Sequence, residues 1–143
     1  MNDLYETDIL TWSEQQAEHL RRFAAAERSN DTVIDWPNII EEIESVGREQ
    51  LHAVESLLFQ ALVHMLKAKA WPTSLATPGW QGEARGFRAQ ARRRFAPSMR
   101  QRIDLMGIYA DALHALPETV DGIPPLPVPA ECPMTLDELL ADG

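Results

Sequence analysis

The chain lacks the features that mark secreted and membrane-bound proteins. Its one cysteine, Cys132, has no partner for a disulfide within the chain, so we expect the fold to rest on an apolar core. No apolar run approaches the roughly 18 residues of a membrane span, and the N-terminal residues lack the basic and then apolar order of a signal peptide. These absences predict a soluble protein of the cytoplasm.

Basic residues are scarce as well. There are 13 of them against 22 acidic residues, which gives a formal net charge of -9 and a pI near 4.8. Such a balance argues against a general binder of nucleic acids or anionic membranes. With 143 residues, of which 45% are hydrophobic, we expect a single domain that buries on the order of 68% of its unfolded surface.

No strand pattern is present, and the apolar residues instead recur every three or four positions. This spacing predicts an all-α fold, a bundle of about four helices over residues 1–116, with an extended strap over residues 117–143. The helices are expected near 7–27, 36–70, 80–95 and 98–116, with Thr7 or Asp8 capping the first and Ser98 the fourth. The predicted apolar face of the first helix is Ile9, Trp12, Gln16, Leu20 and Phe23, and that of the fourth is Met99, Ile103, Met106, Ala110 and Leu113.

The second predicted helix carries the strongest pattern, because no proline interrupts it up to Trp71. Its main face repeats at positions 36, 40, 43, 47, 51, 54, 58, 62 and 65, close to the eleven-residue period of a nearly straight helix. Gly47 is the unusual member of that face, since glycine costs about 1 kcal/mol relative to alanine inside a helix. It either admits a close neighbouring helix or marks a break.

Six of the ten prolines lie between Pro117 and Pro133, which favours extended chain there. The residues from Thr135 to Leu140 then show a capping-box pattern and predict a short helical turn. We expect this strap to lie along its own bundle, anchored by Val128 and the closing leucines. The alternative is a recognition peptide of the PxxP kind.

The predicted helix lengths do not match. A 35-residue helix spans roughly 53 Å, whereas the other three span about 30 Å each, so the first helix can cover only its N-terminal half. A group of aliphatic residues there would face one partner: Ile39, Ile40, Ile43 and Val46. Either the helix breaks near Ser45 to Gly47, or the strap returns, or a second molecule covers these residues. We expect self-association through them as a homodimer, or binding of another protein.

Several segments, in one order along nearly the whole chain, resemble a bacterial family known as domain of unknown function twenty-nine. They are Tyr5-Glu6-Thr7-Asp8 with Trp12, Asp35-Trp36, the run from Glu41 to Arg48, His64-Met65-Leu66-Lys67, Trp80, Pro97-Ser98 and Cys132-Pro133. The chain departs from the family pattern in a longer first loop at Ser29 to Thr32, in Pro37 and in Met134. The resemblance implies a small all-helical protein and implies no reaction.

No catalytic motif or nucleotide-binding loop is found, so the sequence favours a non-catalytic interaction module without a cofactor. The best arrangement for a metal is Glu41 and Glu44 on one helix face with His19 from the facing helix, which would make a metal-dependent bundle enzyme. That arrangement lacks a fourth ligand. The alternative is a solvated acidic face in which Glu44 pairs with Arg48.

The charge distribution supplies a further candidate. Seven arginines and no acid lie between residues 85 and 102: Arg85, Arg88, Arg92, Arg93, Arg94, Arg100 and Arg102. They could form a face for nucleic acid or an anionic ligand, although the net charge of the molecule opposes nucleic acid. Alternatively they pair with acids such as Glu55 while their stems cover apolar surface.

Overall fold

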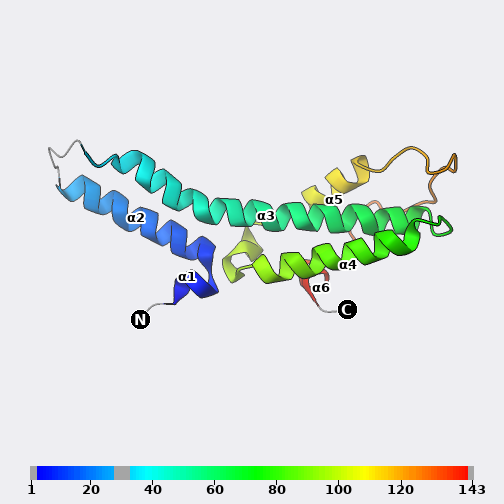
Figure 1. Cartoon of the computed structure of the whole chain (residues 1–143), viewed down its shortest axis with the longest axis horizontal. Helices are drawn as coiled ribbons and strands as arrows, with labels where there is room; N and C mark the ends of the chain where they lie inside the picture. The colour runs from blue at the N-terminus through cyan, green and yellow to red at the C-terminus, as the bar shows by residue number, and fades with distance from the viewer. Residues whose placement is uncertain (1–2, 28–32, 142–143) are drawn as a thin grey trace. The chain divides into compact units, whose positions relative to one another are not determined.

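The computed structural model describes residues 3–27 and 33–141, and it confirms the predicted all-α fold class (Figure 1). Within these ranges no strand forms beyond an isolated bridge between Val120 and Ile123. Among the described helices, none combines the length and the apolar composition that a membrane span requires. The helices are α1 (Leu4–Thr7), α2 (Ile9–Glu27), α3 (Trp36–Ala70), α4 (Thr77–Arg94), the 3-10 helix η1 (Pro97–Gln101), α5 (Leu105–His114) and α6 (Leu136–Leu140).

The chain divides into two compact units that share α3. The first contains the chain up to His52 together with Ala96–Arg102, and the second contains Ala53–Phe95 together with the chain from Ile103 onward. Since α3 runs unbroken from Trp36 to Ala70, the alternative of a break near Ser45 to Gly47 is wrong. The predicted connection at Ser29 to Thr32 lies outside the described residues.

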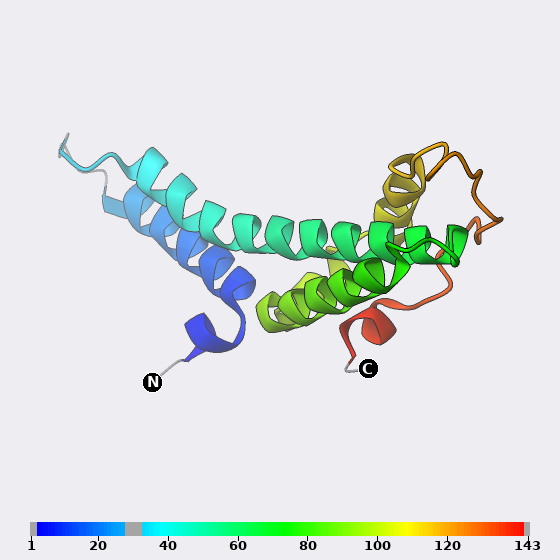
Figure 2. The same ribbon diagram turned by 45° about the vertical axis from the view of Figure 1, so that its right-hand side comes forward.

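The first unit is built on an antiparallel hairpin of α2 and the N-terminal part of α3 (Figure 2). The buried face of α2 consists of Leu10, Ser13 and Ala17. The predicted face, which includes Phe23, is therefore wrong, because it lies on a different side of the helix. Small residues occupy this face because the two backbones approach closely. A Cβ at Gly47 would lie 3.0 Å from the Leu10 Cα and would overlap the Ser13 Oγ. Gly47 thus admits a close neighbouring helix, one of the two roles foreseen for it.

Side-chain contacts join neighbouring helices within each unit. In the first unit, the rings of Phe23 and Trp36 meet edge to face at 5.7 Å between centroids. In the second unit, the centroids of His64 and Phe87 lie 5.4 Å apart, and His64 Nε2 lies 2.6 Å from Glu83 Oε2 on α4. Each pair joins neighbouring helices that a short connection folds back on one another.

The predicted fourth helix is wrong in its start and its face. Ser98 lies in η1, and a new helix, α5, begins only at Leu105, where the carboxylate of Asp104 accepts a hydrogen bond from Gly107 N–H at 3.1 Å. This cap restarts the helix six residues after Ser98 and sets a different buried face. Tyr109 and Ala112 are buried, whereas Met106 is exposed.

Asp8 links the two sequence segments of the first unit. It is the predicted cap of α2, accepting from Thr11 N–H at 3.0 Å, and its carboxylate also accepts from Ser98 N–H at 2.8 Å and Ser98 Oγ–H at 2.7 Å. The hydroxyl expected to cap a fourth helix therefore binds Asp8 instead. Burial by itself raises the pKa of Asp8, but the hydrogen bonds from Thr11 and Ser98 outweigh it and lower the pKa below its usual value.

The second unit confirms that the proline-rich segment is a strap on its own helices. Leu126 N–H donates to the carbonyl of Ala70 at 2.9 Å, and the indole N–H of Trp71 donates to the carbonyl of Ile123 at 2.8 Å. Asp121 and Gly122 both have positive φ and form the tight turn that presents this carbonyl. The strap ends in α6, capped by Thr135 as predicted, whose Leu139 and Leu140 are buried.

Candidate functional site

The α2–α3 hairpin has two sides of opposite chemical character. One side carries a charged cleft of about 480 Å³ with apolar residues Leu10 and Leu51 in its lining. The other carries the aliphatic residues that the sequence singled out for self-association. Helical spacing separates them, because Ile39 and Val46 lie two turns apart on one side of α3 while Glu44 and Arg48 lie on the other.

In the charged cleft, carboxylates of α2 and α3 meet guanidinium groups from other segments of the first unit. Arg21 of α2 donates to Glu44 of α3 at 2.6 Å, and Arg102 donates to both oxygens of Glu14 at 2.6 and 2.7 Å. The hydrogen bond to Glu44 also raises the pKa of Arg21. The Arg21–Glu44 pair joins α2 to α3, and the Arg102–Glu14 pair joins the residue after η1 to α2.

The residues proposed for a metal do not come together. Glu44 accepts from Arg21, and Glu41 accepts from Arg48 at 2.6 Å. Arg48 also lies 3.8 Å from Glu44, which confirms the predicted pair. His19 is exposed. Throughout residues 3–27 and 33–141, no three histidine, cysteine or acidic side chains form a group that could hold a metal ion. The cleft of alternating charges is a feature that the sequence reasoning missed.

The aliphatic residues on the opposite side differ in exposure. Ile40 is buried inside the hairpin and Ile43 is half-buried, so these two contribute to the core of the first unit. Ile39 and Val46 remain 40% and 38% exposed, and from α2 Phe23 is 51% exposed. We call Phe23, Ile39 and Val46 the apolar hairpin face. It carries two of the four predicted residues and adds Phe23, which the sequence had assigned to the core.

The seven arginines fall in both units and have several roles. Arg102 pairs with Glu14 in the first unit. In the second, Arg88 donates to the carbonyls of Leu139 and Glu138, both at 2.9 Å. Arg92 donates to the carbonyls of Leu140 and Ala141 at 3.3 and 3.1 Å. Side chains of α4 thereby bind carbonyls at the C-terminal end of α6, where the helix itself supplies few donors; the Glu138 carbonyl also accepts from Ala141 N–H at 3.3 Å.

Arg85, Arg93 and Arg94 of α4 are exposed, as is Arg100 in the first unit. The sequence foresaw partners among acidic side chains such as Glu55, whereas Arg88 and Arg92 bind backbone carbonyls. Anion binding by the arginines stays a prediction.

Replacing Arg88 with methionine is expected to lower the free energy of unfolding by about 2 kcal/mol, because two carbonyl groups at the end of α6 lose a charged donor. Limited proteolysis should then cut the strap sooner, and urea unfolding measures the loss. Arg93→Met, which makes the same change at an exposed neighbour on α4, is the control and should behave like the wild type. Equal behaviour of the two variants would contradict the capping role.

Comparison with known proteins gives two findings. The family model described as "Domain of unknown function DUF29" matches residues 4–143. Among solved structures, the chain is similar to an alpha-helical protein of unknown function from Rhodospirillum rubrum, with a TM-score of 0.81 and 25% identity. The similarity covers 98% of this chain and 90% of that one. No curated protein matches.

Proposed function

From the premise that this chain belongs to the DUF29 family, whose description assigns no activity, we propose that it is a non-catalytic interaction module that forms a homodimer through the apolar hairpin face. The observation that carries the proposal is the exposure of the apolar side chains of Phe23, Ile39 and Val46 on the α2–α3 hairpin. On α3, Ile40 is buried against α2, whereas Ile39 and Val46 lie beside that interface and stay exposed.

A second copy is the occupant that this face fits. Two hairpins packed face to face form four helices around one apolar centre, which is the common way in which amphipathic helices complete a core. A two-fold arrangement also lets the same residues of both copies meet, so that one self-complementary patch suffices. The ion pairs of the charged cleft lie on the other side of each hairpin and stay in solvent.

The proposal predicts that the double variant Ile39→Glu/Val46→Glu is a monomer while the wild type is a dimer. Four glutamates would meet at the interface, and burying unpaired carboxylates is unfavourable. Light scattering coupled to size exclusion measures the masses, and circular dichroism checks that the helices persist. The matched control is Leu75→Glu, since Leu75 is 99% exposed in the loop between α3 and α4. It should remain dimeric.

Two results would overturn the proposal. One is a wild type that stays monomeric at 100 micromolar, roughly the range in which weak dimers form. The other is a double variant that folds and still dimerises as the control does. Either result would remove the apolar hairpin face as the site of self-association.

A further inference from the structure

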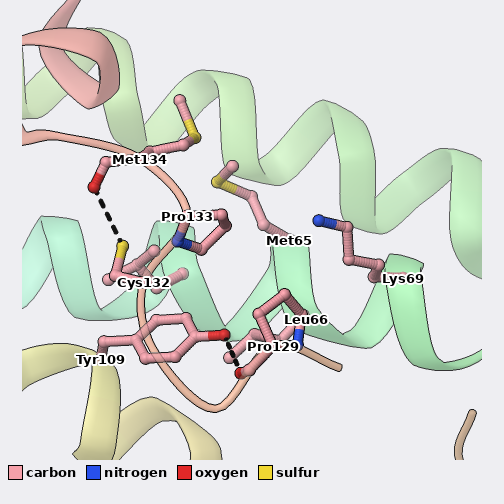
Figure 3. Close-up of a pocket in the computed structure, with 9 residues that line it drawn as sticks. Met65, Leu66, Lys69, Tyr109, Pro129, Cys132, Pro133 and Met134 are labelled. Atoms are coloured by element: carbon pink, nitrogen blue, oxygen red, sulfur yellow. Dashed lines mark hydrogen bonds between the residues drawn. The ribbon is translucent and has the colours of Figure 1, made fainter. Parts of the chain in front are cut away.

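The strap forms one wall of a cavity of about 240 Å³ in the second unit, which is open to solvent on one side (Figure 3). Most of its wall is apolar: Leu62, Met65 and Leu66 from α3, and Pro129, Pro133 and Met134 from the strap. The remaining lining residues are Lys69, Tyr109 and Cys132. An apolar cavity of about 150 Å³ is large enough to hold benzene, and pockets for drug-sized ligands begin near 300 Å³. The cavity therefore suits a small apolar group.

Two of the three polar side chains are already engaged in holding the wall. The Tyr109 hydroxyl donates to the carbonyl of Pro129 at 2.5 Å, and the Cys132 thiol donates to the carbonyl of Met134 at 3.3 Å (Figure 3). Burial raises the pKa of Tyr109, so the phenol stays a neutral donor. The cavity is thus formed before any ligand enters, which lowers the cost of binding.

Lys69 remains as the charged group of the cavity. Its side chain is exposed, and Figure 3 shows it extending toward Met65 at the edge of the cavity. Lys69 and Met65 also line an adjoining open groove, to which α4 contributes Arg85 and Arg88. Among the described residues that line the cavity and the groove, none is acidic. The apolar cavity therefore opens beside a region of positive charge.

We propose that this cavity binds a small amphipathic carboxylate, with its aliphatic chain among the leucine, methionine and proline side chains and its carboxylate beside Lys69 Nζ. The apolar wall selects for the chain, and the charge at the rim selects for an anion over a neutral or cationic molecule. Arg85 adds to the positive potential from the adjoining groove.

Octanoate is the probe, and its neutral analogue 1-octanol separates the two parts of the site. Titration of the ¹H–¹⁵N spectrum of the full chain should show saturable shifts for both molecules, with octanoate binding more tightly. In Lys69→Met the affinity for octanoate should fall at least fivefold while that for octanol stays within twofold. Arg93→Met, a substitution of an exposed cation elsewhere on α4, should change neither.

Two further variants test where the aliphatic chain of the ligand binds. Met134→Trp places a larger side chain in the cavity and should abolish saturable binding of both molecules, with the thermal melt confirming that it folds. Ile39→Glu/Val46→Glu should bind as the wild type does, because the apolar hairpin face is a separate surface. The proposal is overturned if octanoate shows no saturable binding, if Met134→Trp binds normally, or if Lys69→Met weakens both molecules equally.

Discussion

Replacing Gly47 with alanine should destabilise the protein by about 1–3 kcal/mol, the usual cost of overfilling a packed interface. In an exposed helix the same change gains up to about 1 kcal/mol. The sign reverses here because the added Cβ would overlap the Ser13 Oγ and lie 3.0 Å from the backbone of Leu10. A serine hydroxyl can turn aside, but a helix backbone cannot do so without opening the hairpin.

The control for Gly47→Ala lies on α4. A Cβ at Gly86 meets nothing within 4 Å, so Gly86→Ala should raise the free energy of unfolding by up to about 1 kcal/mol. Urea unfolding of both variants measures the difference. The double variant Ser13→Ala/Gly47→Ala should recover part of the loss, a coupling that a double-mutant cycle detects. Equal stabilisation by the two glycine substitutions would contradict the close approach of α2 and α3.

Replacing Asp8 with alanine is expected to cost about 3 kcal/mol, since three partly buried donors lose their acceptor at about 1 kcal/mol each, the low end of the penalty for a buried donor. The carboxylate accepts hydrogen bonds from Thr11 N–H and from both the N–H and the hydroxyl of Ser98. Ser98 is distant from Asp8 and Thr11 in the sequence. Asp8→Asn should cost less, because its amide oxygen can replace one acceptor. Thermal unfolding near pH 7 measures both. Losses of only a few tenths of a kcal/mol in both variants would show that this junction does not hold the first unit together.

Because the pKa of this carboxylate is lowered, we expect the free energy of unfolding to depend on pH. The pKa of Asp8 in the folded protein is lower than the usual aspartate value of about 3.8, so the unfolded chain takes up the proton first as the pH falls. The stabilisation is complete above about pH 4–5 and declines as the pH falls through the lower folded pKa. Urea midpoints measured from pH 6 to pH 2 should show that Asp8→Asn loses less stability in acid than the wild type does. An identical loss would contradict the assignment.

The helices were predictable because large apolar residues recur with helical spacing over long stretches. The boundaries of α3 at Trp36 and Ala70 followed from Pro37, Pro72 and the unbroken pattern between them. The buried face of α2 could not be found in this way, since Leu10, Ser13 and Ala17 include small and polar residues that a hydrophobicity pattern undervalues. Gly47 was the one sequence signal of that close packing.

The candidate sites were less accessible to sequence reasoning, because they depend on contacts between distant segments. The self-association residues were predicted as a group, but which of them face solvent depends on the rotation of α2 against α3. The cavity under the strap joins residues of α3 with residues some sixty positions later. The partners of Arg88 are backbone carbonyls, which carry no side-chain signal in the sequence.

Sedimentation equilibrium of the unmodified protein over a range of concentrations tests the central claim most directly. The account predicts that the fitted mass rises from that of the 16.1 kDa chain to twice that value as the concentration increases. It also predicts that Ile39→Glu/Val46→Glu stays at the mass of one chain throughout. A wild type that keeps the mass of a single chain at every concentration would contradict the account.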